Sequence, residues 1–294
     1  MIKYTIVIPH KNCQDLLDRC LKSIPFRSDM EIIIVDDNSD KNIVDFEHFP
    51  GYTREGVTHV FSEKSGGAGF ARNKGLELAK GEWILFADAD DFYEPNAFNI
   101  IDDLVSEDID MLYFTSISRN SETLQVSDER RVYSNEMVVN YIDKDLESDL
   151  KIRYHNSAPW NKVIRRDIIT NHNIKFDEIK MNNDVFFSIK LGDVVENYKV
   201  VKRDLYCFTF RENSISTQKR LFKDENLLLV NRIRTNQFYN KKNSKILRRR
   251  YLGIFYTVYK RNGLIYFIKY VGFVILNLDY LFLIKKNWEK PEYI

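Results

Sequence analysis

Three carboxylates follow a short apolar run in the N-terminal half of the chain. Asp88, Asp90 and Asp91 come directly after residues 83–87, which are apolar throughout and have the length of a strand. Such a run is typical of a central parallel strand that is buried on both faces. Carboxylates this close together resist desolvation unless a cation balances them. Mg²⁺ and Mn²⁺ bind through one or two carboxylates completed by water and substrate phosphates, so the spacing favours a divalent metal site over a solvated turn that caps the next helix.

A glycine-rich turn at residues 65–73 offers a second candidate contact with a ligand. Gly67 and Gly69 follow an apolar run and precede a helical pattern, which superficially fits a dinucleotide-binding motif. Two details argue against NAD: Arg72 occupies a position where a small residue is needed, and the motif follows the third predicted strand rather than the first. We therefore interpret the segment either as a flexible loop or as a loop that exposes Arg72 toward a nucleotide.

Strand and helix patterns alternate along the first 120 residues. The predicted strands are 4–9, 31–35, 57–61, 83–87 and 111–116, and the predicted helices are 15–24, 68–79 and 96–107. This alternation has the spacing of βαβ units and predicts an α/β fold with a doubly wound, mainly parallel sheet. In such open sheets, ligands bind at the carboxyl ends of the strands, where the three carboxylates stand.

Charge divides the 294 residues into two parts. Residues 220–294 carry 16 Lys and Arg against 5 Asp and Glu, whereas residues 1–219 carry 28 against 38, although the whole chain has a net charge of +1. The two parts are therefore expected to face different partners. Three cysteines without metal-ligand spacing indicate a reducing compartment rather than a disulfide framework. We also expect no secretory signal, because residues 1–11 run directly into a strand.

The basic tail reads as helices that mix bulky apolar residues with Lys and Arg. Residues 263–284 are long enough to span a bilayer, but Lys269 and Asp279 weaken that interpretation. We prefer an aromatic-rich helix pair lying in the membrane interface. Nucleic-acid binding is disfavoured, because long aliphatic runs would serve no purpose against phosphate. A dimer interface remains a third interpretation.

Several segments together resemble a known family. The blocks TIVIPHKN, IIIVDDNSD and GFARNKGLELAKGEWILFADADD, within residues 5–91, resemble the nucleotide-sugar-binding half of the glycosyltransferases of family 2, which have the GT-A fold. Residues 158–167, 182–187 and 206–216 are similar to acceptor-side motifs of bacterial polysaccharide members. Two residues depart from the pattern: His10 replaces the usual aromatic or small residue, and Asn183 stands where many relatives have Glu.

The resemblance implies a domain organisation. A GT-A domain would occupy residues 1–219, with a Rossmann-like nucleotide-sugar-binding half at 1–117 and an acceptor-side half at 118–219. A basic, aromatic-rich helical extension would follow at 220–294.

The resemblance also implies donor-side roles. Asp37 would accept the N3–H of a uracil, which favours uridine nucleotides. Asp90 would coordinate the metal that bridges the diphosphate, and Asp88 would contact the ribose or a metal-bound water. Pro9 and Arg72 complete the donor-side set.

On the acceptor side, the resemblance assigns the catalytic base to Asp184. An inverting transfer needs one base to take the proton of the attacking hydroxyl, and no nucleophile. From the residues alone, the stronger interpretation is that Asp184 merely begins and caps the helix that follows it. Weaker acceptor-side candidates are Asp91, Trp160, Lys162 and Arg211, and a Trp at this place is as readily a core residue.

The expected activity is a metal-dependent inverting transfer of a sugar from a nucleotide donor, UDP-linked by preference. The acceptor would be a saccharide or a lipid-linked glycan in bacterial surface polysaccharide biosynthesis, at the cytoplasmic face of the cell membrane, with Mn²⁺ or Mg²⁺ as cofactor. Two alternatives remain. A sugar nucleotidyltransferase would need a glycine-rich phosphate loop directly after the first strand, which IPHKNCQD lacks. An inactive homologue would serve as a binding or scaffold subunit.

Overall fold

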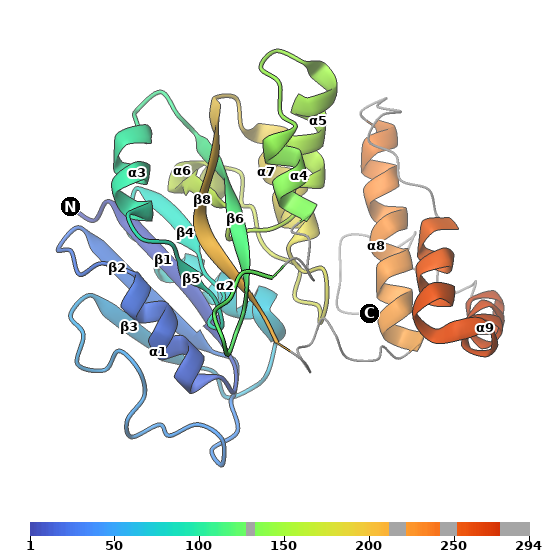
Figure 1. Ribbon diagram of the computed structural model, residues 1–294, viewed down its shortest axis with the longest axis horizontal. Helices are drawn as coiled ribbons and strands as arrows, with labels where there is room; N and C mark the ends of the chain where they lie inside the picture. The colour runs from blue at the N-terminus through green and yellow to red at the C-terminus, as the bar shows by residue number, and fades with distance from the viewer. Residues whose placement is uncertain (128–132, 212–221, 242–251, 277–294) are drawn as a thin grey trace.

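The fold is organised around one mixed sheet. The structure is a computed structural model that describes residues 1–127, 133–211, 222–241 and 252–276 (Figure 1). Within this part of the chain, eight strands form the sheet in the order β3-β2-β1-β4-β7-β6-β8-β5. The strands are β1 (Tyr4–His10), β2 (Met30–Asp36), β3 (Val57–Phe61), β4 (Trp83–Phe86), β5 (Phe92–Tyr93), β6 (Met111–Asn120), β7 (Lys162–Arg165) and β8 (Tyr198–Phe210).

The predicted α/β fold is confirmed, and the first four strands of the chain pair only in parallel with one another. Strands β3, β2, β1 and β4 pair in parallel, in that order. Strand β7 then pairs antiparallel with both β4 and β6, while β8 runs parallel to β6 and antiparallel to β5. Strands β5, β7 and β8 were not among the predicted strands. The carboxyl ends of β1, β2 and β4 lie at one edge, as in other open α/β sheets.

Helices cover both faces of the sheet (Figure 1). They are α1 (Gln14–Ser23), α2 (Gly67–Leu78), α3 (Ala97–Leu104), α4 (Tyr133–Val139), α5 (Leu146–His155), α6 (Arg166–Asn171), α7 (Val185–Val194), α8 (Phe222–Lys241) and α9 (Leu252–Leu276). Successive side chains of a strand point to opposite faces. In β1, Ile6 and Ile8 therefore pack with Leu17 of α1, whereas Val7 packs with Ala71 of α2. Each face thus has its own apolar core.

Within the basic tail, the described helices α8 and α9 form a unit beside the sheet domain (Figure 1). Helix α9 is broken at Gly263, whose φ of +81° favours glycine. The two parts of α9 pack against each other and against Leu229 of α8, burying Val258 and Tyr270. None of the helices that the structure describes combines the length and the apolar character needed to cross a membrane. The predicted apolar stretch continues over residues 277–284, and the predicted boundary at residue 219 falls within 212–221; both lie outside the described residues.

Two contacts dock α8 onto the sheet domain. The Arg234 guanidinium pairs with Asp177, with Nη1 2.5 Å from Oδ2, and lies 3.7 Å from the centre of the Phe186 ring. The Tyr239 hydroxyl donates a hydrogen bond to the carbonyl oxygen of Tyr154, at 3.0 Å. Helix α8 is therefore fixed against α5 and α7.

Candidate active site

Asp91 is the most enclosed of the three carboxylates after β4. Its side chain accepts hydrogen bonds from the backbone N–H of Thr209, at 2.7 Å, and from the hydroxyl of Tyr206, at 3.1 Å. The residue is 1% exposed, and burial, together with the charge of Asp90, raises its pKa well above the ordinary value. Asp91 thus ties the turn after β4 to β8. Its hydrogen bonds favour a structural role over the acceptor contact that the sequence suggested.

Asp88 and Asp90 are more accessible. Their side chains are 27% and 32% exposed. Asp88 accepts a hydrogen bond from Nη2 of Arg72, at 2.5 Å, whereas Oδ2 of Asp90 lies 3.6 Å from Nη2 of Arg211. Burial and the charge of Asp88 raise the pKa of Asp90. Arg211 thus stands beside the predicted metal ligand, although the sequence placed it only on the acceptor side.

The Asp88 and Asp90 pair fits a divalent cation in a limited way. The charge of Asp88 destabilises the charge of Asp90, and a cation would relieve that repulsion. Among the described residues, no group of three or more His, Cys, Asp or Glu is arranged to hold a metal. The described part of the protein therefore supplies two carboxylate ligands, Asp88 and Asp90, and not a complete set of metal ligands. Mg²⁺ or Mn²⁺ would be completed by water and phosphate oxygens, which is how Mg²⁺ is commonly held with nucleotides.

Arg72 is buried, so the expectation that its loop exposes it was wrong. The residue is 6% exposed, and its Nη1 donates to Oδ1 of Asn183 at 2.9 Å while Nη2 donates to Asp88. Helix α2 can approach this closely because a Cβ on Gly69 would lie 2.1 Å from the carbonyl oxygen of Asp177. Arg72 thereby joins the end of β4 to the segment before α7, bringing together two motifs that are far apart in the sequence.

Asp184 lies next to this connection, at the residue preceding α7. Its side chain makes no capping hydrogen bond to the helix, contrary to the interpretation that it merely caps α7. The residue is partly buried, and burial raises its pKa, opposed by the positive charges of Arg72 and Lys162. A carboxylate with a raised pKa, close to Asp88 and without a capping role, has the properties of a candidate general base.

Lys162 and Trp160 are both buried side chains. Lys162 is 1% exposed, and its ammonium donates to the carbonyl oxygens of Asn156, at 3.0 Å, and Ala158. Burial lowers the pKa of Lys162 to about 7. The Trp160 ring is stacked on Tyr206 at 5.2 Å. The structure thus places both in the core beneath the site, rather than along an open pocket.

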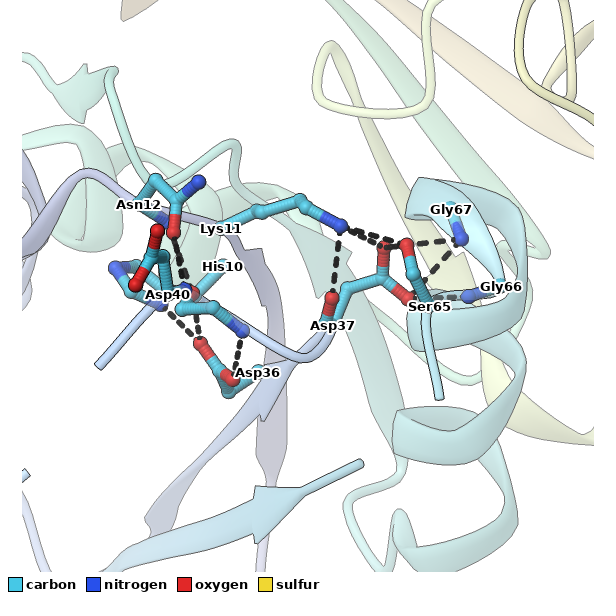
Figure 2. Close-up of polar contacts among 10 residues, drawn as sticks. His10, Lys11, Asn12, Asp36, Asp37, Asp40, Ser65, Gly66 and Gly67 are labelled. Atoms are coloured by element: carbon cyan, nitrogen blue, oxygen red, sulfur yellow. Dashed lines mark hydrogen bonds and ion pairs between the residues drawn. The ribbon is translucent and has the colours of Figure 1, made fainter. Parts of the chain in front are cut away.

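Asp37 connects the end of β2 to the start of α2 (Figure 2). Its carboxylate accepts from the backbone N–H groups of Gly66, at 2.6 Å, and Gly67, at 3.0 Å to each oxygen. The Ser65 hydroxyl donates to Oδ2 at 2.7 Å, and Nζ of Lys11 lies 3.4 Å from the same oxygen. Most of the acceptor capacity of Asp37 is therefore used within the protein, which the sequence did not indicate.

His10 shapes the neighbouring loop (Figure 2). Its Nε2 accepts the backbone N–H of Cys13, at 3.3 Å, so the ring proton is on Nδ1, which donates to Oδ2 of Asp36 at 2.7 Å. Burial opposes the charge of Asp36, but hydrogen bonds from His10 and Ser39 hold its pKa below the ordinary value. This buried pair explains why a histidine can follow Pro9 at the end of β1.

Comparisons with known proteins agree with the fold. The model of the family described as "Glycosyl transferase family 2" matches residues 5–172. The "Putative glycosyltransferase EpsH" of Bacillus subtilis is 29% identical over 254 residues, which cover 82% of this chain and 70% of that protein. The crystal structure of S. aureus TarS with UDP-GlcNAc has a TM-score of 0.60 at 20% identity, covering 79% of this chain and 67% of that one.

A more distant structure carries a metal. The mannosyltransferase PcManGT from Pyrobaculum calidifontis, in complex with GDP-Man and Mn²⁺, has a TM-score of 0.52 at 14% identity, covering 81% of this chain and 64% of that one. At these identities, the likeness to both structures concerns the fold alone.

Proposed function

Because the chain belongs to glycosyl transferase family 2, we propose that it is a metal-dependent inverting glycosyltransferase with a UDP-linked donor. The acceptor is a saccharide or a lipid-linked glycan in the assembly of a bacterial surface polysaccharide. One observation carries the proposal: the Arg72 side chain joins Asp88 of the donor-side motif to Asn183, the neighbour of Asp184 on the acceptor side. The proposed donor-side carboxylate, Asp88, and the proposed base, Asp184, are thereby held in the same region at the carboxyl end of β4.

The donor diphosphate would lie over Asp88 and Asp90. Asp90 is the freer ligand for Mn²⁺ or Mg²⁺, since Arg72 already binds Oδ1 of Asp88. The ion, when bound, would neutralise the charge that develops on the departing nucleoside diphosphate. Arg211, at the same edge, can approach the phosphates. TarS binds UDP-GlcNAc, and PcManGT binds GDP-Man with Mn²⁺, on the same fold, so a nucleotide-sugar donor and a divalent metal are compatible with this fold.

The uracil would be recognised beside Asp37. In the free protein, Lys11 and Ser65 make the more exposed contacts to this carboxylate (Figure 2), and these are the contacts that a base can replace. The backbone N–H bonds from Gly66 and Gly67 would hold the carboxylate in place. Asp37 is therefore both a structural tie and the proposed acceptor for the N3–H.

Asp184 would take the proton of the acceptor hydroxyl. As that oxygen forms a bond to the anomeric carbon, the bond from this carbon to the diphosphate oxygen breaks, and the proton passes to the Asp184 carboxylate. A single displacement inverts the anomeric configuration. Arg72 lowers the electrostatic cost of keeping Asp184 charged close to Asp88.

A thermal-shift panel tests the donor assignment. UDP-sugars with Mn²⁺ should raise the melting temperature of the full chain, since a ligand at a hundred times its dissociation constant stabilises the native state by about 2.7 kcal/mol. GDP-sugars should stabilise it less. No stabilisation by any nucleotide sugar in the presence of metal would contradict the proposal.

Product analysis on the same protein separates the two alternatives. A nucleotidyltransferase would release pyrophosphate from a nucleoside triphosphate and a sugar phosphate, whereas a transferase would release UDP. An inactive homologue would bind the donor and release neither.

We also propose that the tail places the enzyme at the cytoplasmic face of the cell membrane. Helix α9 exposes Leu264, Ile265, Ile268 and Leu276, each at least 58%. Its sequence has three Lys or Arg residues and no Asp or Glu. An apolar surface with basic residues suits the headgroup region of an anionic leaflet, where each basic residue contributes roughly 1 kcal/mol.

Flotation with liposomes tests the membrane proposal. The full chain should float with anionic vesicles at low salt and only partly dissociate at high salt, because the apolar contacts are not screened. Ile268→Glu should reduce flotation, whereas Ile43→Glu, at a similarly exposed isoleucine of the sheet domain, should not. If the full chain does not float, the exposed face of α9 is better explained by pairing with a second copy, which light scattering would detect.

A further inference from the structure

A pocket lies between the sheet domain and the tail. It has a volume of about 280 Å³ and is enclosed by residues from the end of α5, the start of α7, helix α8 and helix α9. Its polar and aromatic lining includes Tyr154, Ser157, Asn182, Asn231, Thr235 and Tyr239. The hydrogen bond from Tyr239 to Tyr154 and the ion pair of Arg234 with Asp177 fix the walls. The pocket is therefore a built feature of the interface between the two units.

Asn231 is the unusual member of the lining. Its side chain is 95% buried, and no described residue accepts a hydrogen bond from its Nδ2. Buried amides are normally paired, because an unpaired one loses its bonds to water without replacement. Rotation about χ2 exchanges Nδ2 and Oδ1, so this amide can present a donor and an acceptor to a ligand.

The lining selects the chemistry of that ligand. Hydroxyl groups, side-chain amides and tyrosine rings surround the cavity, and none of its lining residues is Asp or Glu. Arg232 and His155 also line it and have interactions within the protein, as do the hydroxyls of Tyr239 and Thr235. Among the described residues, Asn231 is therefore the buried side chain of the lining with an amide nitrogen left for a ligand. Such a set suits a neutral ligand whose hydroxyls both donate and accept, and whose apolar face can rest on an aromatic ring. The volume lies just below the usual range of small-molecule sites, which suits a ligand as small as one sugar residue.

The position of the pocket links it to the chemistry. Asn182 and Val185, which line it, flank Asp184 in the sequence at the start of α7. We propose that this pocket binds one sugar residue of the acceptor and that Asn231 hydrogen-bonds to its hydroxyls. This inference rests on the proposed transfer to a saccharide. It gives the tail helix α8 a part in acceptor recognition.

Saturation-transfer NMR on the full chain tests the inference with methyl β-glucoside, methyl β-galactoside, methyl α-mannoside and N-acetylglucosamine as probes. At least one should bind in the millimolar range. Asn231→Leu should weaken that binding tenfold or more. Leucine fills a similar space and leaves no amide unpaired, so the melting temperature of the Asn231→Leu variant should be unchanged or higher. If Asn231 had a structural role instead, the melting temperature of this variant would fall. Gln237→Leu, on the same helix outside the lining, should retain the binding.

Donor stabilisation by UDP-sugars, measured on the same variants, separates this inference from the proposed function. Retained donor binding together with glycoside binding that is unchanged in Asn231→Leu would overturn the pocket assignment alone. Absence of glycoside binding to the natural chain would overturn it as well. If Asn231→Leu fails to fold, Thr235→Val replaces it, since it removes one pocket hydroxyl and keeps the side-chain shape; unaltered glycoside binding there would count against the pocket. If glycoside binding depends on Asn231 but no UDP-sugar binds, the proposed function is wrong. The pocket would then be a sugar-binding site in a protein with a different activity.

Discussion

Asp184→Asn is expected to lower sugar transfer by about 10² to 10⁴ fold, because it removes the general base while preserving the shape of the side chain. Donor affinity should remain, since the proposed donor contacts lie at the ends of β2 and β4. The measurement pairs single-turnover transfer with UDP-sugar binding by thermal shift. Asp167→Asn, at an exposed acid of α6, is the control and should behave as the natural chain does.

The raised pKa of Asp184 gives this prediction a pH dependence. The base acts in its deprotonated form, so transfer should fall as pH decreases through the pKa of Asp184. Because burial raises that pKa, the acidic limb should lie above the usual range of an aspartate. The acidic limb should disappear from the residual activity of Asp184→Asn. Transfer at the natural rate in this variant would exclude Asp184 as the base, and buried Asp91 would be a poor substitute.

The second large effect is expected for Asp90→Ala, which should abolish the Mn²⁺-dependent part of UDP binding. Loss of a residue that merely supports a metal ligand costs about 10- to 100-fold in affinity, so loss of a ligand should cost at least as much. The free protein should keep its stability, because the substitution removes a carboxylate that burial and Asp88 destabilise. Calorimetric titration with UDP, with and without Mn²⁺, measures the difference.

The adjacent Asp91 provides the contrasting control. Asp91→Ala leaves the N–H of Thr209 and the hydroxyl of Tyr206 without their acceptor, so the melting temperature should fall.

If metal-dependent UDP binding survives in Asp90→Ala, Asp90 is not a ligand of the metal.

Local patterns in the sequence were sufficient to predict strands β1 to β4 and the start of β6. Strands β1, β2 and β4 are largely apolar runs, and α1 shows the periodicity of one buried face, so these elements are encoded by their own residues. Strand β3 is only partly buried, and α2 buries small and polar residues instead of an apolar face, so their placement rested on the alternation of strands and helices. Strand β7 was missed because it has only four residues and depends on its neighbours β4 and β6 for its pairing. Short strands of this kind are specified by the tertiary structure rather than by their own pattern.

The site was harder to predict because its contacts join distant segments. The sequence marked Arg72 and Asn183 as notable residues, but nothing local shows that their side chains meet. The burial of Trp160 and Lys162 likewise depends on Tyr206 and on the loop before β7. The pocket at Asn231 was outside the reach of motif analysis, because it exists only where α8 docks. The residue types could be predicted, whereas their partners could not.

The position of β7 in the sheet limits how this enzyme can move. Strand β7 belongs to the predicted acceptor-side half, yet it lies between β4 and β6, which belong to the donor-side half. A hinge rotation of one half against the other would break the hydrogen bonds on both sides of β7. The two predicted halves therefore share one continuous sheet, and separating residues 1–117 as a fragment would expose the edges of β4 and β6 that pair with β7. Any closure around the proposed donor and acceptor is therefore expected from the loops at the carboxyl ends of the strands.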